Sequence, residues 1–160
     1  MKKTAIISIA VVVFDQIIKK IITSKLILGQ SIIIIKNLLN ITYVTNTGAA
    51  FSILSSNIYL LTAISIITLA AIIIYLIKAK TDDNEKIIYA FLCGGISGNL
   101  IDRLFNKAVI DYIDVNLFGY PFPIFNFADM VIVISILLII IYKKDDKNEI
   151  QNWWRKHKTR

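Results

Sequence analysis

Four long apolar stretches divide the chain, and charged or turn-forming residues bound each of them. The stretches cover about residues 4–22, 58–77, 87–105 and 124–142. A helix that crosses a membrane needs about 20 consecutive, mostly apolar residues, so each stretch is long enough to span. The pattern predicts a membrane α-helical protein with four transmembrane helices, forming a single domain over residues 1–160.

The segment between the first two stretches, residues 23–57, has a different character. It contains S-I-I-I-I-K-N-L-L-N-I-T-Y-V-T-N, which is rich in β-branched residues but too polar at its ends to span. β-branched residues favour extended strands. We therefore expect two or three short strands that form a small β-sheet cradle at the membrane surface, with a loop or short helix over the functional site.

Composition and charge support a membrane protein. Hydrophobic residues make up 56% of the chain, and the mean hydropathy is +0.68, which is too apolar for an ordinary soluble domain. The net charge of +7 could suggest a nucleic-acid partner. However, the basic residues lie at the ends of apolar stretches rather than in a patch with interleaved aromatics, so we expect no nucleic-acid binding.

The distribution of lysine and arginine predicts the orientation. Twelve of them lie in the N-terminus, the 78–86 loop and the tail, residues 143–160, against three in segments 23–57 and 106–123. Cytoplasmic loops carry the excess of positive charge. Both termini and the basic tail are therefore expected in the cytoplasm, and segments 23–57 and 106–123 outside it.

Metal and disulfide chemistry are not expected. Cys93 is the single cysteine and His157 the single histidine, and the histidine lies in the polar tail. A structural disulfide or a histidine- and cysteine-ligated metal site needs more of these residues. We expect no metal and no cofactor.

The acidic residues point to a site near one membrane face. Six of the eleven lie in the predicted cytoplasmic segments. The other five lie toward the outer face: Asp15, Asp102, Asp111, Asp114 and Asp129. Ionisable groups at membrane depth are costly and usually functional. Composition leaves two interpretations, an aspartyl protease in which two carboxyls share a proton, and a small four-span ion-coupled transporter or membrane scaffold.

Helical spacing groups several polar residues. Asp15 and Lys19 are four residues apart and share a helix face, which suits a buried ion pair or support for a site. Asn99, Asp102 and Arg103 lie at i, i+3 and i+4, so they are expected on one side of the third span. The Asp102–Arg103 pair could simply neutralise itself.

Two other spacings have ordinary structural interpretations. Gly94 and Gly98 share one face of the third span, where small residues let helices pack closely. Asn126 and Asp129 have N-cap and N3 spacing, so Asp129 could serve only as a cap, and residues 82–85 show the same spacing.

Five motifs, in order along the chain, resemble the bacterial lipoprotein signal peptidases, also called signal peptidase II. They are D-Q-I-I-K (15–19), N-T-G-A-A-F (46–51), G-G-I-S-G-N-L-I-D-R (94–103), V-I-D-Y (109–112) and F-N-F-A-D (125–129). One such motif would be weak, but five with fitting spacing are specific.

The resemblance implies an intramembrane aspartyl endopeptidase of the bacterial cell membrane. Such enzymes remove signal peptides from prolipoproteins, cutting before a cysteine that carries a diacylglyceryl group, and are targets of the cyclic peptide globomycin. Prolipoproteins and membrane lipid are then the expected partners, the protein is expected to be a monomer, and its active site is expected near the extracytoplasmic face.

The resemblance also assigns roles to residues. It places the catalytic pair on Asp111 and Asp129 and implies contacts with the substrate backbone from Asn46 and Arg103. It implies that five further polar residues shape and support the site: Asp15, Lys19, Asn99, Asp102 and Asn126.

Two residues depart from the family pattern, and a third competes for the catalytic role. Tyr112 stands where phenylalanine is usual in the family, and Asp114 has no family counterpart, so we expect a solvated loop acid there. Asp102 competes with Asp111 for the catalytic role. We favour Asp111 because Arg103, beside Asp102, would keep that carboxylate ionised and unable to donate a proton.

Overall fold

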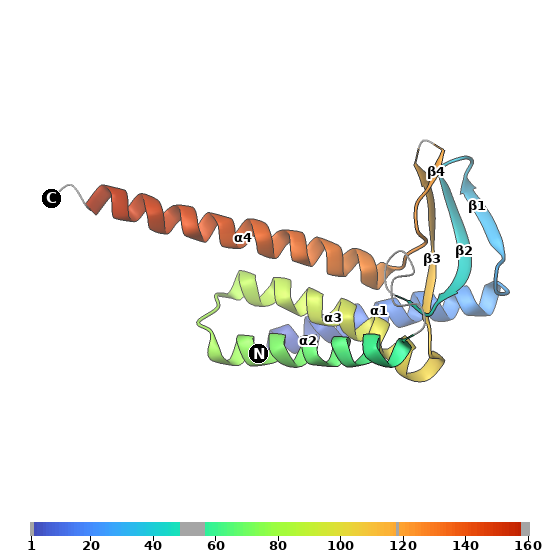
Figure 1. Cartoon of the computed structure of the whole chain (residues 1–160), viewed down its shortest axis with the longest axis horizontal. Coiled ribbons are helices and arrows are strands. Elements are labelled where there is room, and N and C mark those ends of the chain that lie inside the picture. The colour runs from blue at the N-terminus through green and yellow to red at the C-terminus, as the bar shows by residue number, and fades with distance from the viewer. Residues whose placement is uncertain (1, 49–56, 118, 158–160) are drawn as a thin grey trace.

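The computed structural model describes residues 2–48, 57–117 and 119–157 (Figure 1). This part of the chain forms four helices, α1 (Lys2–Lys25), α2 (Ile58–Lys78), α3 (Asp83–Asn106) and α4 (Phe127–His157). It also forms four strands, β1 (Ser31–Ile35), β2 (Leu39–Asn46), β3 (Val109–Leu117) and β4 (Tyr120–Pro121). The helical class and the small sheet are confirmed.

Helix α3 is the centre of the bundle and packs against α1, α2 and α4. Its glycines make this possible. A Cβ atom on Gly94 would lie 2.6 Å from the Cβ of Val11, and one on Gly98 would lie 2.6 Å from Oδ2 of Asp15. The packing role predicted for Gly94 and Gly98 is therefore confirmed, and their partner is α1.

The sheet is antiparallel, with the strands in the order β1-β2-β3-β4. Figure 1 shows it at the end of the bundle where α1 and α3 end and α4 begins. The register pairs Val44 with Asp111 and Asn46 with Val109, so the end of β2 lies beside the part of β3 that carries Asp111. The strands of segment 23–57 were expected, whereas β3 and β4 were not.

Two helices of the described residues, α2 and α3, are long and apolar enough to cross a membrane. The exposed surface of α2 suits lipid, because most of its large outward-facing side chains are isoleucines, among them Ile67 and Ile77, each 66% exposed. Helix α1 has Asp15, Lys19 and Lys20 within its apolar run, which makes it less uniformly apolar.

Helix α4 differs from the predicted fourth span at both ends. It begins at Phe127 rather than at residue 124, because Phe125 still forms a bridge with Ile113 of β3. It then continues to His157, so most of the predicted tail is helical. At 1.5 Å per residue its 31 residues extend about 46 Å, well beyond the hydrocarbon thickness of about 30 Å.

A cluster of polar side chains joins three helices at the end of the bundle farthest from the sheet. Asp82 caps α3 by accepting a hydrogen bond from the Glu85 N–H at 2.9 Å, as its spacing predicted. The Glu85 carboxylate in turn accepts from Lys143 Nζ at 2.6 Å and from the Tyr75 hydroxyl at 2.9 Å. These contacts connect α2, α3 and α4.

Candidate active site

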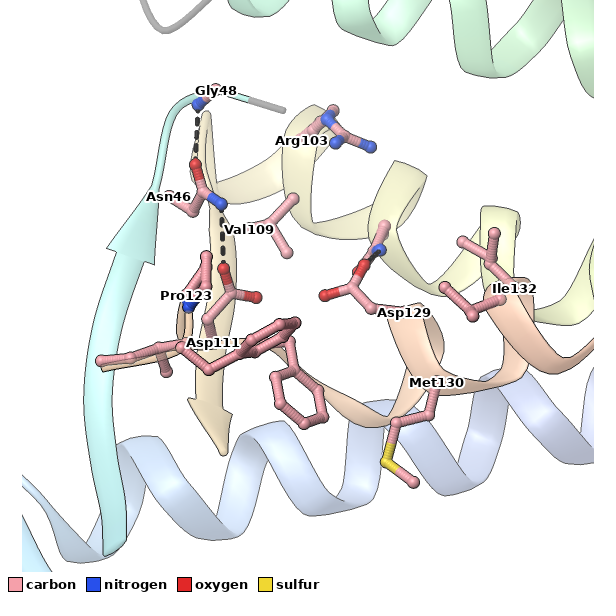
Figure 2. A pocket seen from close by; sticks show the side chains of 14 residues that line it. Asn46, Gly48, Arg103, Val109, Asp111, Pro123, Asp129, Met130 and Ile132 are labelled. Atoms are coloured by element: carbon pink, nitrogen blue, oxygen red, sulfur yellow. Dashed lines mark hydrogen bonds between the residues drawn. The ribbon is translucent and has the colours of Figure 1, made fainter. Parts of the chain in front are cut away.

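Asp111, from β3, and Asp129, from the first turn of α4, line the same cavity of about 560 Å³. Figure 2 shows their carboxylates pointing toward one another across it. The two residues are on different element types. They meet because the chain turns from β3 into β4 and runs back along β3, where Phe125 bridges to Ile113, to the start of α4. The fold thus brings together the two carboxylates that the motifs singled out.

Side-chain amides connect these two carboxylates. Asp111 accepts from Asn46 Nδ2 at 3.0 Å and from Asn126 Nδ2 at 2.7 Å. Asp129 accepts from Asn99 Nδ2 at 2.7 Å. Asn126 Nδ2 also lies 3.1 Å from Asn99 Oδ1. An unbroken chain of hydrogen bonds therefore runs from one carboxylate to the other.

Asn126 and Asp129 also form the cap of α4. The Asp129 N–H donates to Asn126 Oδ1 at 2.9 Å, and the Asn126 N–H donates to Asp129 Oδ2 at 3.1 Å. Such a reciprocal pair satisfies two backbone donors that the first turn leaves free. Asp129 therefore caps α4 and also lines the cavity. The sequence had offered these two roles as alternatives.

A fully buried lysine lies behind the cavity. Lys19 Nζ is 2.8 Å from Asp15 Oδ2, 2.8 Å from Asp102 Oδ2 and 3.0 Å from Asn99 Oδ1. Lys19, Asp15 and Asp102 are each at most 1% exposed. The ion pair predicted from the Asp15–Lys19 spacing is confirmed, and a second carboxylate shares the same cation.

Arg103 does not pair with Asp102, so the expected reason for keeping Asp102 ionised was wrong. Asp102 pairs with Lys19 and accepts from the Ile110 N–H at 3.1 Å. Arg103 instead lines the cavity, lies 3.5 Å from Ser65 Oγ, and forms no ion pair with a carboxylate in the described part of the chain. Neighbouring helical residues point about 100° apart, which separates these two. Asp102 does not line the cavity, and this position argues against a catalytic role.

Asp114 is not a solvated loop acid, as the sequence suggested. It lies within β3, is half-buried, and is paired in register with Asn40 of β2. Its carboxylate accepts from Thr42 Oγ1 at 2.7 Å and from Asn40 Nδ2 at 3.3 Å. Strand pairing explains the difference, because the prediction treated segment 106–123 as a loop.

Three contributors were missed. Gln16 Nε2 lies within 3.2 Å of Asp15, Asp102 and the Gly98 carbonyl, and its place inside the D-Q-I-I-K motif was a usable signal. Gly95 brings α4 close, since its Cβ would meet the Ala128 carbonyl at 2.8 Å. Tyr112 accepts from the Phe127 N–H at 3.1 Å, a contact that phenylalanine could not make.

Burial sets the ionisation behaviour of the strand residues. Burial, and after it the nearby negative charge of Asp129, raise the pKa of Asp111 from its usual value to about 6. The hydrogen bonds from Asn46 and Asn126 oppose this rise. Because its pKa is raised in this way, Asp111 can hold a proton near neutral pH. Burial also raises the pKa of the Tyr112 hydroxyl to about 12.

Ala49, Ala50 and Phe51, which complete the N-T-G-A-A-F motif, lie outside the described residues. The expected loop or short helix over the site stays a prediction. Across residues 2–48, 57–117 and 119–157, no group of three or more histidine, cysteine or acidic side chains is arranged to hold a metal ion.

Comparison with solved structures identifies the class of protein. A bacterial membrane enzyme solved by the in meso method at 2.3 Å resolution superposes with a TM-score of 0.86 and 39% sequence identity, over 93% of this chain and 92% of that one. A second bacterial membrane enzyme, solved at 1.9 Å, gives a TM-score of 0.80 and 40% identity over 89% and 92%. The chain has the fold of a bacterial membrane enzyme.

Sequence comparison identifies the family. The family model described as signal peptidase (SPase) II matches residues 7–143. The lipoprotein signal peptidase of Staphylococcus haemolyticus (strain JCSC1435) is 42% identical over 144 residues, 89% of this chain and 91% of that protein. That of Staphylococcus aureus (strain JH9) is 42% identical over 146 residues, 90% of each. This chain belongs to the signal peptidase II family, and the transporter interpretation has no support.

Proposed function

We propose that this chain is a lipoprotein signal peptidase of the aspartyl type. It removes signal peptides from diacylglyceryl-modified bacterial prolipoproteins and cuts before the lipidated cysteine. The observation that carries the aspartyl mechanism is the position of Asp111 and Asp129, which face one another across one cavity (Figure 2). The names of the relatives support the substrate class.

The chemistry follows from a shared proton. One carboxylate of the pair takes a proton from water, which attacks the scissile carbonyl carbon, while the other carboxyl donates to the carbonyl oxygen. The pKa of Asp111, raised to about 6 by burial and by Asp129, favours a singly protonated pair close to neutral pH. Such a pair titrates as a unit.

The cavity wall suits a lipid-modified substrate. Most of its apolar lining comes from the segment before α4 and from α4 itself, including Phe122, Ile124, Phe125, Met130, Ile132 and Val133. Met130 and Val133 are also 41% and 55% exposed on the outer surface of α4. The apolar wall is thus continuous with a surface that lipid would cover, so acyl chains can stay in the bilayer while the peptide bond reaches the carboxylates.

Arg103 and Asn46 are proposed to contact the substrate backbone. Both line the cavity, and the buried Nε of Arg103 has no hydrogen-bond partner within the described residues. Backbone carbonyl groups of a substrate suit the Arg103 guanidinium, which can only donate. A substrate could also bind by pairing its backbone with a strand, but β2 and β3 already have a neighbour on each side, which leaves only the outer edges of the sheet. Arg103 and Asn46, which line the cavity, are therefore the better candidates for contact with the substrate backbone.

The topology is part of the proposal. We place four spans in the bacterial cell membrane, both termini in the cytoplasm and the cavity near the extracytoplasmic face. The positive charge supports this, because it gathers in the termini and the 78–86 loop. The sheet and the start of α4 lie at the opposite end of the bundle from that loop (Figure 1), and residues of β3 and of the first turns of α4 line the cavity. One chain supplies both carboxylates, so a monomer suffices.

Cleavage of a diacylglyceryl-modified prolipoprotein in detergent tests the function. The wild type should cut, and Asp111→Asn and Asp129→Asn should each lose cleavage by roughly 10³-fold or more. Asp114→Asn is the matched control, since Asp114 lies on the same strand but bonds to β2, and should cut at nearly the wild-type rate. Asp102→Asn tests the rejected candidate. Normal cleavage by either dyad variant would refute the mechanism.

A further inference from the structure

Lys19 determines the orientation of an amide that touches the catalytic pair. Its ammonium can only donate, and its three near neighbours are oxygens of Asp15, Asp102 and Asn99 at 2.8, 2.8 and 3.0 Å. Three donors therefore meet three acceptors. Asn99 has to turn its carbonyl oxygen toward Lys19, because its amino group there would place donor against donor.

The orientation of Asn99 acts on Asp129. With Oδ1 held by Lys19, the amino group Nδ2 points to Asp129 Oδ1 at 2.7 Å. The other oxygen of Asp129 accepts from the Asn126 backbone N–H at 3.1 Å. Neither the Asn99 amino group nor the Asn126 N–H can accept a hydrogen bond. A proton on an Asp129 oxygen that pointed at either group would therefore meet another hydrogen. The N-terminal end of α4 also favours negative charge at this position.

Asp111 is supported differently, although the charge of Lys19 also acts to lower its pKa. It lies on a strand, not at a helix N-terminus, and both its hydrogen bonds come from side-chain amides, those of Asn46 and Asn126. Within the described residues, backbone donors turn both amides, the Gly48 N–H on Asn46 and the Asp129 N–H on Asn126, so neither amide has a positive charge bonded to its oxygen. Burial raises the pKa of Asp111 to about 6, in agreement with this difference.

The remaining charged groups around the pair do not reverse the difference between the surroundings of Asp129 and Asp111. Arg103 of α3 lines the cavity with both carboxylates and attracts both. Asp15 of α1 and Asp102 of α3 each form an ion pair with Lys19. Tyr112 of β3 keeps its proton, since burial raises its pKa to about 12, and residues 58–77 of α2 carry no charge.

We propose that Lys19 is a positioning residue that acts through Asn99 to keep Asp129 as the carboxylate of the pair, so that Asp129 is the base and Asp111 the acid. This inference rests on the proposed aspartyl function and adds the direction of proton flow. Among the residues implied to support the site, it gives two a defined task.

The steps balance with these assignments. Asp129 takes a proton from water, the water oxygen bonds to the scissile carbonyl carbon, and Asp111 gives its proton to the carbonyl oxygen. In the resulting gem-diol, Asp129 passes its proton to the amide nitrogen, one hydroxyl returns a proton to Asp111, and the C–N bond breaks. The products are a carboxylic acid and an amine, and the pair returns to its starting state.

Asn99→Asp is the informative variant. It preserves size and an oxygen for Lys19, but it replaces the donor facing Asp129 with a negatively charged acceptor. In the pH profile of kcat for prolipoprotein cleavage, we expect the acidic limb to move up by about one pH unit, with KM unchanged. Lys19→Met, which frees the Asn99 amide to turn, should move the same limb in the same direction.

Lys20→Met is the matched control, because Lys20 is exposed on the same helix and undergoes the same change. It should leave both limbs and kcat unaltered. Folding of every variant is measured by thermal unfolding in detergent.

An equal fractional loss at every pH, or movement of the alkaline limb alone, would overturn the positioning role. Failure of both variants to fold would also overturn it, because it would assign Lys19 and Asn99 to stability only. The proposed function fails separately, if Asp111→Asn or Asp129→Asn still cuts.

Discussion

Two pairs of carboxylates lie in the same end of the bundle, and their surroundings differ. Asp15 and Asp102, behind the cavity, each lie 2.8 Å from the ammonium of Lys19. Among the residues that the structure describes, Asp111 and Asp129, in the cavity, have only amide and backbone N–H donors as hydrogen-bond partners. A cation neutralises a buried carboxylate and keeps it ionised, whereas an amide holds its position without adding charge. The lysine-bound pair is thereby suited to structure and the amide-bound pair to proton exchange.

The largest expected effect is a difference in folding stability between variants of the two pairs. Asp102→Ala leaves the buried Lys19 with one carboxylate fewer and the Ile110 N–H without its acceptor. Breaking a buried pair in this way costs about 3–5 kcal/mol. Asp111→Ala, the matched change in the other pair, removes no partner of a cation and should cost less than half as much. Thermal unfolding in detergent measures both, and equal losses would contradict the comparison.

A smaller effect is expected from the packing that places Asp15. Gly98→Ala would put a Cβ 2.6 Å from Asp15 Oδ2 and 3.0 Å from its Cγ, which forces the carboxylate away from Lys19. Overpacking of this kind costs about 1–3 kcal/mol. Ser97→Ala, one residue earlier on α3, should be nearly neutral in the same unfolding measurement. A stable Gly98→Ala protein would mean that α1 can shift without loss.

The amide-bound pair is examined by its pH dependence. Asp111 must be protonated to donate, so kcat/KM should fall as the pH rises through about 6, the value to which burial raises its pKa. Asn46→Ala removes a hydrogen bond that lowers this pKa. The decline should therefore move to higher pH by about half a unit. Thr45→Ala, exposed on the same strand, should leave the profile in place, and a shift to lower pH in Asn46→Ala would contradict the assignment.

The smallest effect belongs to the cluster at the other end of the bundle. Lys143 donates to Glu85 and Tyr75, and the Glu85 bond is the main cause of a raised pKa for Lys143. The Lys143 side chain is 44% exposed, so solvent screens the pair, and Glu85→Gln should cost less than about 1 kcal/mol. The pH profile of cleavage should stay unchanged. A changed profile would show coupling along α3 between the two ends.

Residues close together on one element were predictable from the sequence. The Asp15–Lys19 ion pair, the cap at Asp82 and the reciprocal cap of Asn126 and Asp129 all involve positions three or four apart, and all are present. The membership of Asp111 and Asp129 in one site was inferred from the motifs of a family rather than from spacing. Their shared cavity agrees with that inference.

Contacts between elements were not predictable in this way. The sequence by itself determined the apolar segments, the β-branched strands and the i, i+4 pairs, because chain geometry sets the direction of neighbouring side chains within a helix or strand. Only the tertiary structure decided that Lys19 holds Asp102, that amides join the two cavity carboxylates, and that Asp114 pairs with β2. Those partners depend on how closely α1 approaches the glycines of α3 and on the register of β2 with β3, and neither is encoded in the spacing of residues along one element.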